Sequence, residues 1–195
     1  MFGACSSLME TSPTTDVDKE RILADAEGLQ VAMNGVYSTM YNRLDFVSAN
    51  AHQCFGNMAV TLAADLMGDD MVQTAQGAGW FWKDYNYDQR SRYTSKIWRC
   101  YFTWEYLYEI ISNVNHIISA AETATGDENE IKCTTAQAYA ARAFSYFMLI
   151  QSFQQTLVGH EDLPGVPIYT EPTTASSKGR KRSPVREVYA RIDED

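Results

Sequence analysis

The most regular pattern of apolar positions along the chain covers residues 97–121. Apolar residues recur there in alternating steps of four and three, which is the spacing of one face of an α-helix. The stripe consists of Ile97, Tyr101, Trp104, Tyr108, Ile111, Asn115 and Ile118, widened by Leu107, Ile110, Val114 and Ile117. This width predicts a largely buried helix with Trp104 and Tyr108 as structural core residues. Asn115 shares the stripe and is expected to hydrogen-bond to another helix, because buried amides are normally paired.

A second long helix is predicted over residues 134–153. Thr134 is followed three positions later by Gln137, which is the spacing of a capping box, so we expect Thr134 to begin the helix. Three large side chains share one face of this helix at positions i, i+3 and i+4: Phe144, Phe147 and Met148.

Arg142 is a charged residue within this mostly apolar helix. Its guanidinium group needs a carboxylate or carbonyl partner, or must extend to water, because an unpaired buried charge is costly. We interpret Arg142 as one half of a buried structural ion pair, with a contact to a ligand as the alternative.

Two shorter helices are predicted in the first third of the chain. The first covers residues 25–42 and contains Gly28 and Gly35, which are expected to allow close packing because each costs helix stability. The second lies within residues 51–66. With the two long helices, they predict an all-α protein with long irregular connections.

A last helix is predicted from Ser183, the expected capping residue, with Pro184 in the first helical position. Its pattern stops at the last residue without a capping signal, so we expect the sequence to be the N-terminal piece of a longer polypeptide. Val188 and Ile192 are then expected to be exposed apolar side chains.

Residues 74–95 lose the helical period and are unusually rich in aromatic side chains among Gly, Asn, Asp and Gln. The aromatic residues are Trp80, Phe81, Trp82, Tyr85, Tyr87 and Tyr93. Flat rings with a polar edge can stack on sugar rings while polar neighbours bond the hydroxyl groups. The alternative is that one or both tryptophans fill the helical core beneath this segment.

Charge and motif content exclude several classes of function. Sixteen basic and 25 acidic residues give a net charge of −9, which disfavours a nucleic-acid partner. The cysteines lack the spacing of zinc or redox sites, and no nucleotide-binding or catalytic motif occurs, so neither metal nor cofactor is predicted. Cys54, Cys100 and Cys133 are either free thiols or partly joined by a disulfide. No apolar run is long enough to span a membrane. The pattern indicates binding or scaffolding rather than catalysis.

The first residues, Met-Phe-Gly-Ala before Cys5 and a Ser-rich polar stretch after it, resemble the cleavage end of a bacterial lipoprotein signal. The cationic and apolar parts that normally precede such a site do not occur in this sequence. Residues 1–24 are therefore interpreted as a tail or linker, with Cys5 as the candidate lipidation site.

Five stretches, in order, resemble the N-terminal part of the SusD/RagB family of nutrient-binding outer-membrane lipoproteins of the Bacteroidetes. They are the segment from Ala26 to Tyr37, the Trp104–Leu107–Tyr108–Ile111–Val114–Asn115 helix pattern, the segment from Gln137 to Phe147 with Arg142, the turn from Leu163 to Pro167, and the segment from Arg182 to Ile192.

The resemblance implies tetratricopeptide-like helix pairs over residues 25–195. It also implies that Cys5 is acylated and that residues 6–24 connect it to the helical domain. It implies a non-enzymatic protein at the cell surface, anchored to the outer membrane by lipid alone. Such proteins capture oligosaccharides, or in some cases peptides, for a TonB-dependent transporter.

The motifs that carry the resemblance are structural and name no sugar contacts. The candidate glycan-binding residues therefore come from residues 74–95, called here the aromatic segment. They are Trp80, Trp82, Tyr85 and Tyr87 for stacking on sugar rings, and Asn86 and Asp88 for hydrogen bonds to sugar hydroxyl groups. Two alternatives remain open. One is a peptide-binding or scaffolding helical-repeat protein without glycan affinity; the other is a glycosidase, which needs two suitably placed carboxylates.

Overall fold

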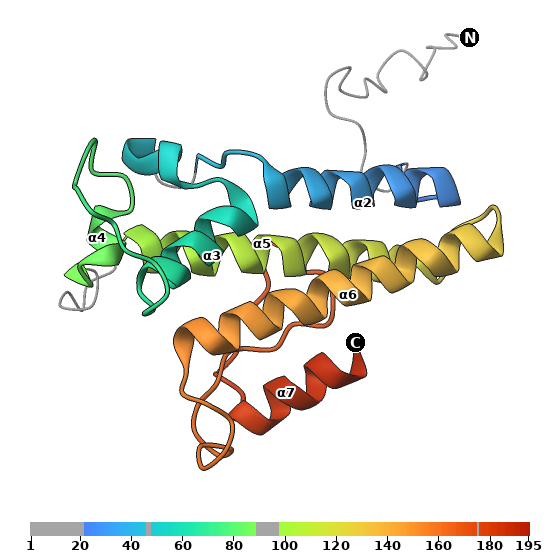
Figure 1. Ribbon diagram of the computed structural model, residues 1–195. Helices are drawn as coiled ribbons and strands as arrows, with labels where there is room; N and C mark the ends of the chain where they lie inside the picture. The colour runs from blue at the N-terminus through green and yellow to red at the C-terminus, as the bar shows by residue number, and fades with distance from the viewer. Residues whose placement is uncertain (1–21, 46–47, 89–97, 175) are drawn as a thin grey trace, which may run out of the picture.

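The computed structural model describes residues 22–45, 48–88, 98–174 and 176–195 (Figure 1). Its elements are α2 (Ala26–Tyr41), the 3₁₀-helix η2 (Ser48–Gln53), α3 (Gly56–Leu66), α4 (Trp82–Tyr85), α5 (Trp98–Ala121), α6 (Glu128–Phe153) and α7 (Val185–Glu194). The described residues form helices and two isolated bridges, and no strand. The all-α prediction is confirmed.

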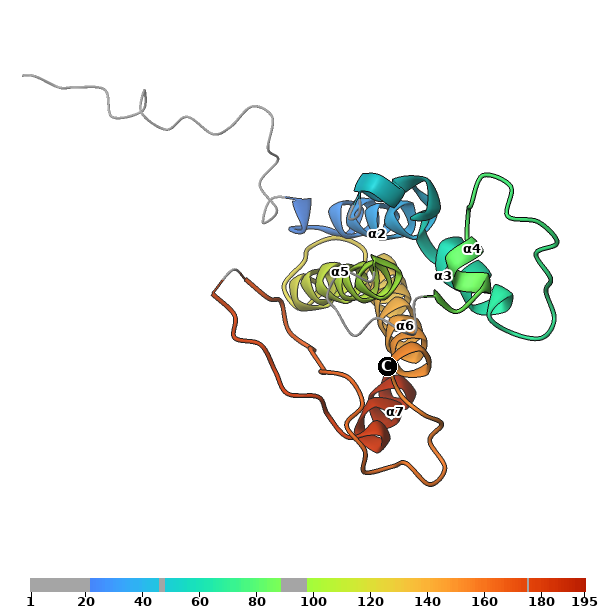
Figure 2. The same ribbon diagram turned by 90° about the vertical axis from the view of Figure 1, so that its left-hand side faces the viewer.

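Helix α5 is the centre of the arrangement (Figure 2). It packs against α6, to which a short turn connects it, and against α2, while α7 packs on α6. Backbone hydrogen bonds from Ala26 N–H to Thr125 O (2.9 Å) and from Thr125 N–H to Ala24 O (3.0 Å) join the start of α2 to the turn between α5 and α6. Helix α5 therefore runs antiparallel to both α2 and α6, as successive helices do in helical-repeat proteins.

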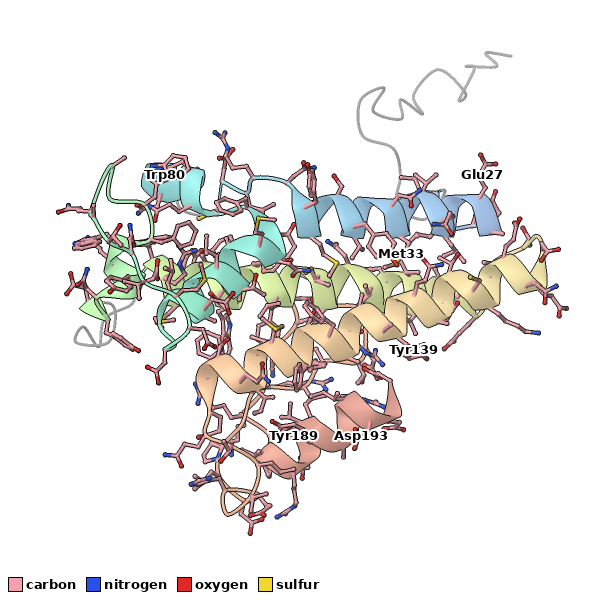
Figure 3. All side chains as sticks on the ribbon, in the orientation of Figure 1. Glu27, Met33, Trp80, Tyr139, Tyr189 and Asp193 are labelled. Atoms are coloured by element: carbon pink, nitrogen blue, oxygen red, sulfur yellow. The ribbon has the colours of Figure 1, made fainter. Side chains whose placement is uncertain are left out.

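The core lies where α2, α5 and α6 meet. Figure 3 shows Met33 pointing from α2 toward the other two helices. The fully buried large side chains are Leu29, Met33, Phe102, Tyr106, Leu107, Ile110, Ile111, Val114, Ile117, Tyr146, Leu149 and Ile150. Of the stripe predicted for α5, Leu107, Ile110, Ile111, Val114, Asn115, Ile117 and Ile118 are buried, Trp104 and Tyr108 are half-buried, and Tyr101 is exposed. Ile97 lies outside the described residues.

The predicted start of α6 is wrong by six residues. The helix begins at Glu128, because the Asp127 carboxylate accepts hydrogen bonds from Asn129 N–H (2.8 Å) and Glu130 N–H (3.1 Å) and so caps the chain earlier. Thr134 lies buried inside the helix and donates to Gln30 of α2 (3.1 Å).

The face that carries Phe144, Phe147 and Met148 is not the buried face of α6. Phe147 is exposed and Phe144 and Met148 are only half-buried, whereas the buried face carries Ala138, Ala141, Arg142, Ser145, Tyr146, Leu149 and Ile150. The small side chains let neighbouring helices approach α6 closely, so this face is the one covered.

The last helix differs from its prediction in two details. Pro184 rather than Ser183 stands before the first helical residue, without a side-chain cap. Val188 is fully buried rather than exposed, because α7 packs on α6 and on the segment around Gly165. Ile192 is half-buried. Among the described cysteines, Cys54, Cys100 and Cys133 are free thiols.

Replacing Gly28 with alanine is expected to destabilise the protein by about 1–3 kcal/mol, the usual cost of overpacking. A Cβ there would lie 1.5 Å from the carbonyl oxygen of Ile22. Gly35 on the same helix has open space around such a Cβ, so Gly35→Ala is expected to stabilise by about 0.5–1 kcal/mol. Urea denaturation of both variants tests the contrast, and a shift of the same sign in both would contradict it.

Candidate functional site

The aromatic segment connects α3 to α5 at one end of the molecule, where Figure 3 labels Trp80. Trp80 is 51% exposed, and its ring lies 5.1 Å from that of His52 on η2. Gln73 donates a hydrogen bond to the Trp80 backbone oxygen (3.1 Å). The indole is therefore held in place while much of its surface faces solvent.

A buried ion pair anchors this segment to α5. Two nitrogens of Arg99 donate to the two carboxylate oxygens of Asp84 on α4, at 3.2 and 3.1 Å, and a third donates to Gln53 O at 2.9 Å. Arg99 and Asp84 are both nearly inaccessible. Such a two-pronged pairing fixes orientation as well as distance, so α4 is rigidly positioned.

Phe81 is the ring of this segment that enters the core. It is 4% exposed and adopts left-handed backbone geometry (φ 55°), while its N–H donates to the Gln53 side chain (2.7 Å). The Arg99 guanidinium lies 4.7 Å from the Phe81 ring centre and 4.1 Å from that of Trp98, within cation–π range. Trp80 and Trp82, on either side of Phe81, are not among the buried core residues. Of these three consecutive rings, Phe81 is therefore buried, Trp82 is half-buried and Trp80 is exposed.

The other candidate residues follow directly on α4. The half-buried rings of Trp82 and Tyr85 lie 5.7 Å apart, and the Asn86 side-chain N–H group donates to Trp82 O (2.7 Å). Tyr87 is exposed and its hydroxyl bonds Met67 O. Asp88 is exposed. The segment therefore offers two aromatic surfaces, Trp80 beside His52 and the Trp82–Tyr85 pair. The Asn86 amide nitrogen and the Tyr87 hydroxyl already donate hydrogen bonds to backbone oxygens of the protein.

Trp104 and Tyr108 do more than fill the core. Both are half-buried, their ring centres lie 4.8 Å apart, and Trp104 also meets Phe153 edge-on at 5.0 Å. Their free sides line a cleft of about 310 Å³ between α5 and a wall formed by residues 167–174 and 176–179. The helical period of α5 does not predict this cleft, because the wall opposite α5 comes from a segment that is far away in the sequence and has no helical period.

Arg142, Asn115 and Asp195 form a buried polar network. Arg142 donates to the two Asp195 carboxylate oxygens at 2.7 and 2.6 Å, and to the Asn115 side-chain oxygen at 2.7 Å. Burial would lower the pKa of Arg142, but the hydrogen bonds and charge of Asp195 outweigh it and hold that pKa above its usual value. The guanidinium thus ties α6 to α5 and α7 rather than facing a pocket.

No helix in the described ranges combines the length and apolar character needed to cross a bilayer. The antiparallel packing of α5 with α2 and with α6 defines the chain as an all-α helical-repeat protein. The exposed Trp80 and the cleft beside Trp104 are surface features of a kind that proteins use for binding.

The comparisons with known proteins agree with this class. The family model described as "Starch-binding associating with outer membrane" matches residues 8–195, and the chain belongs to this SusD-like family. A curated protein of Formosa agariphila, SusD-like protein P2, is 30% identical over 149 residues, which cover 76% of this chain and 27% of that protein. The chain thus spans about a quarter of the length of this curated relative.

Solved structures show the same fold. A SusD-like carbohydrate binding protein from Bacteroides vulgatus superposes with a TM-score of 0.71 at 21% identity, covering 88% of this chain and 34% of that one. A putative sugar binding protein from the same organism gives a TM-score of 0.66 at 27% identity, over 87% and 35% of the two chains. These matches confirm the resemblance inferred from the five sequence stretches.

Proposed function

We propose that the protein captures glycans at the outer membrane, with the aromatic residues around Trp80 as a sugar-binding surface. The family description supports starch-like ligands and association with the outer membrane. The single observation that carries the local assignment is the exposed Trp80 ring, fixed on a segment whose base is anchored by the buried Arg99–Asp84 pair. An aromatic surface that is rigid before binding loses little entropy when a sugar stacks on it.

The finer parts of the proposal concern the anchor and the partner. Cys5 would carry the lipid that tethers the protein, with residues 6–24 as the linker to the helical domain of residues 25–195. A TonB-dependent transporter would accept the captured glycan, and the protein itself would perform no catalysis. Residues 1–21 lie outside the described part of the chain, so these roles depend on the sequence pattern and on the family.

Replacing Trp80 with alanine is expected to weaken binding of a neutral oligosaccharide by about tenfold or more, as for a central aromatic contact. The experiment uses full-length protein purified from outer membranes in mild detergent, with calorimetry against a panel that includes maltoheptaose. Tyr41→Ala is the matched control, because Tyr41 is 82% exposed and lies outside the aromatic segment.

Mass spectrometry of the same preparation reports an acyl group on Cys5 and any co-purifying transporter. Equal affinities of the Trp80→Ala and Tyr41→Ala variants would remove the sugar-binding role of the aromatic segment. Binding of peptides but of no glycan would favour the helical-repeat alternative. An unacylated protein without a transporter would refute the anchor and the partner.

A further inference from the structure

The cleft between α5 and the wall of residues 167–174 and 176–179 has the size and the lining of a binding site separate from the aromatic segment. Its volume of about 310 Å³ falls at the lower end of small-molecule sites, roughly 300–1,000 Å³. Three aromatic rings border it, those of Trp104, Tyr108 and Tyr169, with Tyr108 and Tyr169 in edge-to-face contact at 5.9 Å. None of the lining residues belongs to the aromatic segment around Trp80.

The wall opposite α5 is an irregular segment held by many polar contacts. Tyr108 donates to Pro167 O (2.7 Å), and the Asn115 amide donates to Tyr169 O (3.0 Å). The Tyr146 hydroxyl both donates to Tyr169 O (2.9 Å) and accepts from Tyr169 N–H (2.7 Å). These bonds hold Pro167 and Tyr169 against α5 and α6, so this part of the cleft is formed before any ligand enters.

Hydroxyl groups and one positive charge complete the lining. Ser112 on α5 faces Thr173 across the cleft, with their hydroxyl oxygens 3.3 Å apart, and Thr174 and Ser177 lie beside them. Within the described part of the chain, Lys178 is the charged side chain among the lining residues. Hydroxyl groups that can both donate and accept suit a polyhydroxylated ligand, and an ammonium group suits an anion.

Residues 178–182 add positive charge at the end of the cleft where Lys178 lies. Lys178, Lys181 and Arg182 have no salt-bridge partner among the described residues, while Arg180 lies over the Tyr169 ring at 5.3 Å. Burial raises the pKa of Tyr108, and Arg182 is close enough to act in the opposite direction. The net charge of −9 does not cancel this local field, because salt screens charges beyond about 8 Å at physiological ionic strength.

We propose that this cleft binds a sugar residue that carries an anionic group, a carboxylate or a sulfate ester, with the ring against Trp104 and Tyr108 and the anion at Lys178. The proposal rests on the proposed function in one respect, namely that the ligands are glycans. It adds a second site and a charge preference that the surface around Trp80 does not supply.

The test compares matched pairs of oligosaccharides that differ only in charge. Full-length protein is titrated with de-esterified and methyl-esterified oligogalacturonides, and with sulfated and desulfated carrageenan oligosaccharides, at physiological salt. The variants are Lys178→Gln, Lys181→Gln as a control that removes an equal charge three residues from Lys178 outside the lining, and Trp80→Ala.

One anionic member is expected to bind more tightly than its neutral partner, and Lys178→Gln is expected to weaken that binding by about three- to tenfold. Lys181→Gln is expected to change it by less than about twofold, because an exposed charge outside the contact contributes little. Trp80→Ala should leave the preference for the anion intact. The carboxylate and sulfate pairs identify which anion the cleft accepts.

Equal losses in the two lysine variants would overturn the proposal, since they would indicate a diffuse positive surface. So would equal affinity for charged and neutral members. If neutral glycans bind in a Trp80-dependent manner while charge makes no difference, the proposed function stands and the cleft proposal fails. If no glycan of either kind binds, both fail.

Discussion

Replacing Arg142 with alanine is expected to lower the free energy of unfolding by about 3–5 kcal/mol, the usual cost of breaking a buried ion pair. Arg142 is 2% exposed, and its removal would leave the buried Asp195 carboxylate with the 3.3 Å contact to Arg191 Nε, which does not replace the two hydrogen bonds from Arg142. Asn115 would lose the same donor. Because these groups link α6 to α5 and to α7, the loss is expected to affect the cooperative unfolding of the whole domain.

Urea denaturation followed by circular dichroism measures this loss. Arg142→Lys keeps the charge but cannot reproduce the two-pronged contact, so it should recover only part of the stability. Arg43→Ala is the matched control, because the Arg43–Asp45 pair is exposed and is expected to contribute less than about 1 kcal/mol. A similar midpoint for the Arg142→Ala and Arg43→Ala variants would contradict a structural role for the network.

Replacing Asp84 with asparagine is expected to loosen the aromatic segment and, through it, to weaken glycan binding. The change would leave Arg99 buried beside a neutral amide, which costs about 3–5 kcal/mol by the same reasoning. The amides of Phe81, Tyr85 and Asn86 are hydrogen-bonded within this region. They should therefore report local opening directly.

Hydrogen exchange separates this local effect from global unfolding. In the Asp84→Asn variant the amides around α4 should exchange faster, while those in the middle of α5 and α6 keep most of their protection. Asp70→Asn, at an exposed acid before the aromatic segment, serves as the control and should exchange like the unmodified protein. Unchanged protection around α4 in the Asp84→Asn variant would show that the ion pair does not anchor the segment.

Several elements of the fold are predictable because their signals are local. The sequence predicts α2 within one residue at each end, since Asp25 and Asn42 flank the helix and Asp25 supplies the cap through its own side chain. It predicts α5 because the apolar period is sustained over the whole helix. The start of α6 is mispredicted because Thr134 and Asp127 both carry capping side chains and the intervening residues suit a helix.

The aromatic segment shows what local patterns omit. Composition alone singles out Trp80 and Trp82 as candidate ligand contacts, but it does not distinguish them from Phe81, which lies between them and is the ring that fills the core. Phe81 adopts a left-handed backbone conformation, which the residues around it do not signal. Arg99, fifteen residues after Asp84, is not visible as the partner of that carboxylate until α4 and α5 are placed together.

By itself, the sequence determines the helical class, most of the long helices and the membership of the family, because periodicity, capping and short motifs are properties of neighbouring residues. Only the tertiary structure decides that Trp104 and Tyr108 border a cleft, that Pro167, Tyr169 and the residues from Thr173 to Gly179 that line it form its second wall, and that Arg142 pairs with Asp195. Those pairings join residues far apart in the chain, and they depend on how the helices pack against one another rather than on any local pattern.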